Sequence, residues 1–280
     1  MRLARIGAPG QERPAAFDGT DWRDISTLYP DIDGRLLSGD TERVAAGLNA
    51  GDLPILRSGQ RFGAPLSGIG KIVCIGLNYR DHAKETGAAE PAEPIIFMKA
   101  PDTVVGPEDQ VLIPRGSTKT DWEVELGVVV GASARYLDSP DDSAAHIAGY
   151  VLSHDVSERE FQIERGGQWD KGKNCETFNP MGPWLVTADE IADPQALGMR
   201  LWVTRQLRQN GSTKNMIFDV AYLVWYLSQF MVLRPGDVIN TGTPAGVALG
   251  LPDQPFLRDG DVVELEIDDL GYQRQIFGQA

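Results

Sequence analysis

Short apolar runs separated by turn-forming residues recur along most of this sequence, which contains 31 Gly and 18 Pro among 280 residues. Runs this short are typical of β-strands, whereas helices need longer stretches with apolar residues at helical spacing. The expected strands cover residues 71–76, 94–98, 123–130, 149–154, 201–204, 238–241 and 261–267, and the expected helices cover 41–50 and 219–230. Because the strands outnumber the helices and do not alternate with them, we expect a β-dominated α+β fold.

The first part of the chain differs from the rest and predicts a separate unit. Up to residue 66, short apolar pieces alternate with Gly, Pro and Asp turns, and no cluster of candidate catalytic residues is present. All the motifs described below follow residue 70. We therefore expect a small N-terminal domain over residues 1–66 and a larger catalytic domain over residues 67–280.

The charge balance limits the kind of partner that this chain can have. It carries 40 acidic and 26 basic residues, a net charge of −14, whereas binding to a nucleic-acid backbone needs clustered Lys and Arg. No apolar run reaches the length of a signal peptide or a membrane span. Two cysteines, Cys74 and Cys175, are too few for a disulfide scaffold. We expect a cytoplasmic protein with a small-molecule substrate and without nucleic-acid or membrane partners.

Two glutamates in the expected strand 123–130 are the first candidates for chemistry. Side chains two apart on a strand point to the same face, so Glu123 and Glu125 project together. A solvated strand face would be the ordinary explanation for this pair alone. A third carboxylate, Asp155, directly follows the expected strand 149–154. Because neighbouring carboxylates repel one another unless a cation lies between them, the three predict a site for a hard divalent cation such as Mg²⁺ or Mn²⁺.

His82 and Glu85 are candidates for water activation. They are three apart in a segment that can form a short helix, which makes them neighbours on one face. Glu85 would then orient the imidazole and raise its basicity, although a surface ion pair is the commoner meaning of this spacing.

Two less specific features follow. Lys173 lies in an expected loop and has the charge to steady an enolate or carboxylate, and the turn around Thr243 offers a hydroxyl and backbone N–H groups to an anion.

Seven motifs follow one another from residue 76 onward. They are G-L-N-Y-R-D-H-A-K-E (76–85), F-M-K (97–99), D-W-E-V-E-L-G (121–127), H-D-V-S-E-R (154–159), K-G-K-N-C-E-T-F-N-P-M-G-P-W (171–184), R-P-G-D-V-I-N-T-G-T-P-A-G-V (234–247) and G-D-V-V-E-L-E-I (260–267). In this order they resemble the fumarylacetoacetate hydrolase family, and the set is far more specific than any single motif. Within the family, the chain resembles the bacterial group often labelled ureidoglycolate lyase-like, which includes hydrolases of 2,4-diketo-3-deoxy-L-rhamnonate and L-fuconate.

The resemblance implies a mixed β-sandwich or roll around the active site, preceded by the small N-terminal domain and assembled as a homodimer or a higher homo-oligomer. It also implies Mg²⁺ (or Mn²⁺) as cofactor and a His–Glu pair on a mobile lid. The matching positions are Glu123, Glu125 and Asp155 for the metal, His82, Glu85 and Lys173 for catalysis, and Arg159, Gln162 and Thr243 for substrate contacts. Leu77 departs from the pattern, because some acylpyruvase-like members have Arg there.

The implied activity is hydrolysis of a carbon–carbon bond in a small 2,4-dioxo acid, either a 2,4-diketo-3-deoxy sugar acid or an acylpyruvate, with release of pyruvate. Two other reactions would use the same site: oxaloacetate decarboxylation, which needs no attacking water, and ureidoglycolate lysis. A non-catalytic ligand-binding protein is the alternative from another class. Such a protein has no use for a water-activating pair like His82 and Glu85.

Overall fold

Eighteen β-strands and five α-helices make up the computed structural model, which describes residues 1–280. The strands are β1 (Arg2–Ile6), β2 (Arg13–Phe17), β3 (Trp22–Asp24), β4 (Ile72–Gly76), β5 (Ile95–Lys99), β6 (Val104–Val105), β7 (Val111–Ile113), β8 (Thr120–Asp121), β9 (Val124–Val130), β10 (Ile147–His154), β11 (Ser157–Glu158), β12 (Asn179–Pro180), β13 (Leu185–Thr187), β14 (Gly198–Val203), β15 (Gln206–Ser212), β16 (Val238–Asn240), β17 (Val262–Ile267) and β18 (Gly271–Gln279). The helices are α1 (Gly34–Leu37), α2 (Thr41–Ala50), α3 (Arg80–Thr86), α4 (Asp170–Lys173) and α5 (Val220–Ser228). None of these helices has the length and apolar character that a membrane span requires.

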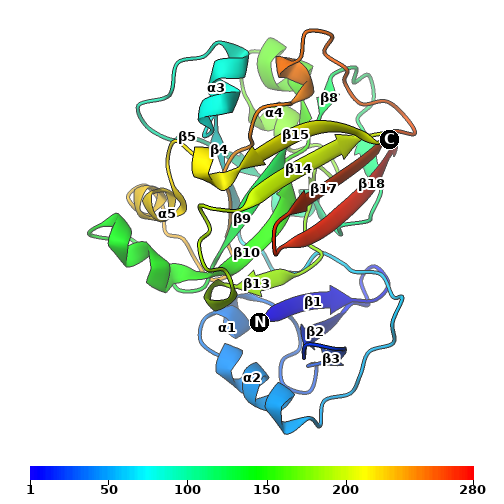
Figure 1. Cartoon of the computed structure of the whole chain (residues 1–280), viewed down its shortest axis with the longest axis vertical. Coiled ribbons are helices and arrows are strands. Elements are labelled where there is room, and N and C mark those ends of the chain that lie inside the picture. Colours follow the sequence, from blue (N-terminus) through cyan, green and yellow to red (C-terminus); the bar gives the residue numbers. More distant parts are fainter.

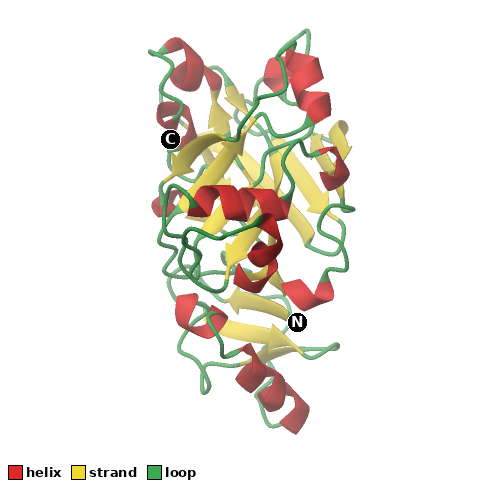
Figure 2. Ribbon diagram, turned by 90° about the vertical axis from the view of Figure 1, so that its left-hand side faces the viewer, coloured by secondary structure: helices red, strands yellow, loops and turns green.

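Two sheets carry most of the strands. The larger has nine strands in the order β3-β2-β1-β13-β10-β9-β16-β4-β5, and the smaller has five in the order β15-β14-β17-β18-β7. Figure 2 shows the strands running through the middle of the molecule, with helices around them. Each strand and helix expected from the sequence forms, with ends within three residues of the expected ones. The fold is mixed and strand-dominated, which confirms the expected fold class.

Strand β9 lies at the centre of the fold and is buried on both faces. Its even-numbered residues, from Val124 to Val130, pack in the core between the two sheets, together with apolar residues of β14 and β17. Val129 packs on the opposite face, in a second core that includes residues of α1, α2 and β4. Glu123 and Glu125 share the face of Val129, because side chains alternate along a strand. The two glutamates therefore point away from the core between the sheets and towards β4, β5 and α4.

The N-terminal strands extend the nine-stranded sheet. β1 pairs antiparallel with β13, with Leu3 opposite Leu185, and β2 and β3 continue the sheet outward from β1. Figure 1 shows β1–β3, α1 and α2 together at one end of the molecule, next to β13. The division of the chain into domains at residue 66 stays a prediction.

Candidate active site

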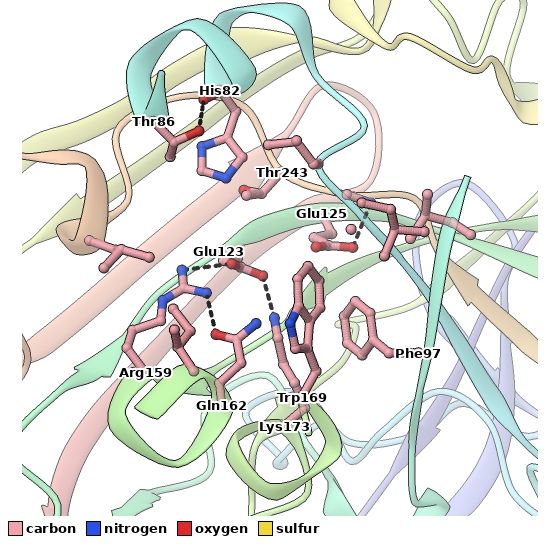
Figure 3. A pocket seen from close by; sticks show the side chains of 17 residues that line it. His82, Thr86, Phe97, Glu123, Glu125, Arg159, Gln162, Trp169, Lys173 and Thr243 are labelled. Atoms are coloured by element: carbon pink, nitrogen blue, oxygen red, sulfur yellow. Dashed lines mark hydrogen bonds and ion pairs between the residues drawn. The ribbon is translucent and has the colours of Figure 1, made fainter. Parts of the chain in front are cut away.

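A cavity of about 200 Å³ opens between α3, the start of β9 and α4. Figure 3 shows His82 above this cavity and Glu123 and Glu125 at its centre. Seven of the nine residues predicted for the site line the cavity. The other two, Glu85 and Asp155, contact lining residues. The structure thus brings all nine predicted residues to one place.

Glu123, Glu125 and Asp155 converge because their strands are paired. β9 and β10 run antiparallel with Ser153 opposite Glu125, and the Asp155 N–H extends this pairing by donating to the Glu123 carbonyl at 3.0 Å. One carboxylate oxygen of each residue lies within 4.8 Å of the others, and all three residues are buried. This set of oxygen donors has the chemistry that Mg²⁺ and Mn²⁺ prefer.

Two buried lysines neutralise part of the negative charge. Lys173 Nζ donates to Glu123 Oε2 and to Asp155 Oδ2, both at 2.7 Å. Lys99 Nζ donates to Asp155 Oδ1 at 2.5 Å and to the Val156 carbonyl at 3.0 Å. Both oxygens of Asp155 are therefore held by ammonium groups, which fixes the orientation of this carboxylate.

Arg159 joins the triad to a fourth carboxylate. Its guanidinium donates to Asp121 Oδ2 at 2.8 Å and to Glu123 Oε1 at 2.7 Å. Burial alone would raise the pKa of Glu123, but Lys173 and Arg159 outweigh burial and lower that pKa to about 2. Arg159 also donates to Gln162 Oε1 at 3.0 Å, so the amide nitrogen of Gln162 remains for a ligand in the cavity.

One carboxyl group in this cluster has no cationic partner side chain. Four buried carboxylates face three buried cations; they are Asp121, Glu123, Glu125 and Asp155 against Lys99, Arg159 and Lys173. Glu125 forms no ion pair and accepts a hydrogen bond from the Gly242 N–H at 2.8 Å. Burial, together with Asp155 and Glu123, raises the pKa of Glu125 well above its usual range. The residues present therefore fit a divalent cation, which would neutralise Glu125.

Lys173 reaches the carboxylates from a helix, so the expectation of a loop at this position was wrong. α4 packs directly on the short π-helical turn formed by residues Glu160–Glu164. Gly172 allows this close approach, because a Cβ there would lie 2.3 Å from the Glu158 carbonyl oxygen and 2.6 Å from the Gln162 nitrogen. Glycine has a low intrinsic helix propensity, so the sequence pattern around Gly172 does not indicate the helix α4.

His82 and Glu85 form the predicted pair on α3. His82 Nδ1 lies 3.2 Å from Glu85 Oε2, and Glu85 Oε1 accepts from the Gly246 N–H at 2.9 Å. With its Nδ1 proton directed at Glu85, the imidazole presents Nε2 as an acceptor. Figure 3 shows the ring extending from α3 into the cavity, above Thr243. This arrangement fits a base that takes a proton from a water molecule in the cavity.

Thr243 lines the cavity, but its hydroxyl already makes two hydrogen bonds. Oγ1 donates to the Val124 carbonyl at 2.9 Å and accepts from Gln209 Nε2 at 2.8 Å. These bonds tie the turn after β16 to the start of β9 and leave one lone pair for a ligand. A substrate contact at Thr243 stays a prediction.

Two members of the cluster, Lys99 and Asp121, are not among the residues predicted from the sequence. Asp121 precedes Glu123 by two residues, so the alternation that joins Glu123 to Glu125 also indicates Asp121. Lys99 is the only polar residue of β5. A lone lysine at the end of an otherwise apolar strand is the signal that would have found it, because a buried ammonium needs carboxylate partners.

Replacing Lys99 with Met is expected to destabilise the protein by about 3 kcal/mol, because it removes one partner of a buried ion pair. The effect lies at the low end for such a change, since Lys173 still contacts Asp155. Urea unfolding of the metal-free protein measures the loss. Lys119→Met is the matched control, because Lys119 pairs with Glu164 at the surface, where ion pairs add little stability. Equal unfolding midpoints for Lys99→Met and the parent would contradict the prediction.

A family model described as fumarylacetoacetate (FAA) hydrolase C-terminal matches residues 71–277. A protein of Burkholderia cenocepacia that carries the general name hydrolase is 49% identical over 277 residues, which cover 98% of each chain. Fumarylacetoacetate hydrolase from the psychrophilic Exiguobacterium antarcticum is 32% identical, with a TM-score of 0.86 over 100% of each chain. Maleylpyruvate hydrolase from Sphingobium sp. SYK-6, solved with manganese(II) and pyruvate, is 29% identical, with a TM-score of 0.83 over 100% of each chain. These matches confirm the resemblance read from the motifs: the chain belongs to the fumarylacetoacetate hydrolase family.

Proposed function

We propose that this protein is a divalent-metal-dependent hydrolase that cleaves the C3–C4 bond of a small 2,4-dioxo acid and releases pyruvate. The observation that carries the proposal is that a buried carboxylate triad and an oriented His–Glu pair meet at one cavity, each with at least one member lining it. The balanced reaction is R–CO–CH₂–CO–COO⁻ + H₂O → R–COO⁻ + CH₃–CO–COO⁻ + H⁺. The general name hydrolase of the Burkholderia relative supports this reaction class.

Glu123, Glu125 and Asp155 would hold the cation. When bound, a divalent cation supplies Lewis acidity towards the carboxylate and 2-oxo oxygens of such a substrate. Gln162 would donate from its amide nitrogen to the same end of the substrate, because its oxygen is already bonded to Arg159. The manganese and pyruvate in the related maleylpyruvate hydrolase structure support both the kind of ion and the kind of product.

His82 would act as the general base. Its Nε2 takes a proton from a water molecule, and the water oxygen adds to the C4 carbonyl of the substrate. The imidazolium that forms is stabilised by the Glu85 carboxylate at 3.2 Å. Because Glu85 is also bonded to the Gly246 N–H, it keeps the imidazole in one orientation during this transfer.

Lys173 would stabilise the negative charge that develops next. When the C3–C4 bond breaks, its electrons remain on C3 as the enolate of pyruvate, and R–COOH is the other product. The Lys173 ammonium lines the cavity and places a fixed positive charge beside this enolate. A proton added to C3 then completes pyruvate.

Metal removal tests this proposal. Pyruvate release from acetylpyruvate is expected to fall to the uncatalysed background after treatment with a chelator, and to return when Mg²⁺ or Mn²⁺ is added in excess. Oxaloacetate and ureidoglycolate, assayed in parallel, are expected to react more slowly, since neither uses water attack at a C4 ketone. Pyruvate release that resists the chelator would contradict the metal dependence, and faster turnover of oxaloacetate would replace hydrolysis by decarboxylation.

A further inference from the structure

One wall of the cavity is apolar. It is formed by Ile95, Phe97 and Trp169, and Leu77 and Ile163 also line the cavity. Phe97 and Trp169 contact each other edge to face, with ring centroids 5.6 Å apart. In Figure 3 these two rings stand on the side of Glu123 away from Arg159. A ligand that spans the cavity from the carboxylates therefore meets hydrocarbon on this wall.

Trp169 fits into this wall because residue 76 is a glycine and leaves room for the indole ring. A Cβ on Gly76 would lie 2.5 Å from Cζ3 of Trp169 and 3.0 Å from its Cη2. The indole thus packs on the backbone of β4, beside Ile95. The Phe97 ring also contacts the buried ammonium group, since Lys173 Nζ lies 4.9 Å from its centre.

The cations near this wall are already paired. Arg159 donates from all three of its nitrogens, to Asp121, Gln162 and Glu123. Lys173 donates to two carboxylates. The wall therefore has no unpaired ammonium or guanidinium group for a second carboxylate of a substrate, and few polar groups for a row of hydroxyls. Burying a charge or hydroxyls without partners is costly.

We propose that the substrate tail at C4 is an uncharged hydrocarbon group, so that the preferred substrates are alkyl- or aryl-acylpyruvates. This inference rests on the proposed function and narrows it: 2,4-dioxo acids with a second carboxylate, or with a polyhydroxylated tail, are poor substrates. Trp169 and Ile163 are the residues that set this preference, Trp169 as the floor of the tail site and Ile163, which is 47% exposed, at its mouth.

A substrate series tests the proposal. With Mn²⁺ present, kcat/KM for pyruvate release is expected to rise about fourfold with each methylene added to acetylpyruvate, until the wall is covered. Benzoylpyruvate is expected to exceed maleylpyruvate by about a hundredfold or more, because maleylpyruvate would bury an unpaired carboxylate. A 2,4-dioxo-3-deoxy sugar acid serves as the polyhydroxylated substrate, and its kcat/KM is expected to be as low as that of maleylpyruvate.

Two variants locate the preference. Trp169→Ala is expected to lower the benzoylpyruvate to acetylpyruvate ratio of kcat/KM about tenfold or more, because the tail loses its packing partner. Ile163→Arg supplies a cation at the mouth and is expected to raise the maleylpyruvate to benzoylpyruvate ratio. It keeps the test valid if Trp169→Ala fails to fold. Phe230→Ala is the control, since Phe230 is an exposed aromatic residue outside the cavity and should leave both ratios unchanged.

The outcomes separate this inference from the proposed function. Pyruvate release from acylpyruvates together with a preference for maleylpyruvate or the sugar acid would overturn the apolar tail and leave the hydrolase assignment intact. Ratios that neither variant changes would also overturn it. No pyruvate from any 2,4-dioxo acid, in a protein that binds Mn²⁺, would instead contradict the proposed function itself.

Discussion

Glu125→Gln is expected to weaken divalent-metal binding about a hundredfold or more and, at the same time, to stabilise the metal-free protein. Glutamine keeps the side-chain length and an oxygen for the Gly242 N–H, but it removes the charge. In the presence of metal the change removes one of the three carboxylates proposed to hold the cation. Without metal it removes a buried carboxylate that has no ion pair and lies beside Glu123 and Asp155. Because burial and these two neighbouring carboxylates disfavour the charged form of Glu125, its replacement by Gln is expected to add about 1 kcal/mol of stability.

Calorimetric titration with Mn²⁺ measures the affinity, and thermal unfolding in chelator measures the stability. Glu158→Gln is the matched control: Glu158 is also buried, and burial also raises its pKa, but it is bonded to Ser117 and lies outside the cavity. This control is expected to bind Mn²⁺ as tightly as the parent. Unchanged affinity in Glu125→Gln would show that the triad is not the metal site. A lowered melting temperature would show that the Glu125 carboxylate stabilises the metal-free fold.

The parts of the site that could be predicted from the sequence are those set by local geometry. Alternation along a strand brings Glu123 beside Glu125, and a three-residue step on a helix brings His82 beside Glu85. Asp155 is predicted from its position, because a polar residue directly after a buried strand often belongs to a binding or catalytic site. Each of these patterns lies within a few residues, so the sequence shows it without knowledge of the fold.

Contacts between distant segments could not be predicted in this way. Lys99 meets Asp155 across 56 positions and Lys173 meets Glu123 across 50. Both pairs depend on how β5, β9, β10 and α4 come together, which no local spacing records. The resemblance of the ordered motifs supplied Lys173 as a site residue, whereas Lys99 stood in a quoted motif without a role. The apolar wall at Trp169 was missed for the same reason, since its members come from separate segments.

Strand β18 shows a different limit of prediction from the sequence. It turns Gln273 and Gln275 inward, and both are fully buried. Gln273 Nε2 donates to the carbonyls of Leu152 and Gly182 at 2.8 and 2.9 Å, and Gln275 Oε1 lies 3.0 Å from His154 Nδ1. A strand that buries hydrogen-bonded amides shows no apolar alternation, so the pattern that predicts seven of the other strands does not find this one.

His82→Ala is expected to lower pyruvate release from an acylpyruvate about 10²- to 10⁴-fold, because it removes the base that takes a proton from the attacking water. The affinity for Mn²⁺ is expected to stay at the parent value, since His82 pairs with Glu85 and belongs to a different element from the carboxylate triad. Single-turnover pyruvate release at saturating Mn²⁺ measures the chemical step, and calorimetric titration measures the metal affinity. His146→Ala is the control, because His146 contacts the Ala132 carbonyl and does not line the cavity.

Oxaloacetate makes the His82 experiment specific for the role of the imidazole. Its decarboxylation develops the same enolate but needs no attacking water. His82→Ala is therefore expected to slow decarboxylation less than about tenfold, whereas hydrolysis falls about a hundredfold or more. The ratio of the loss in hydrolysis to the loss in decarboxylation distinguishes a role of His82 in proton transfer from a role in positioning the substrate. If both reactions fell by one factor, His82 would act by shaping the cavity. If neither fell, water activation would belong to another group. A large loss confined to hydrolysis would place the base on α3, opposite the carboxylates on β9.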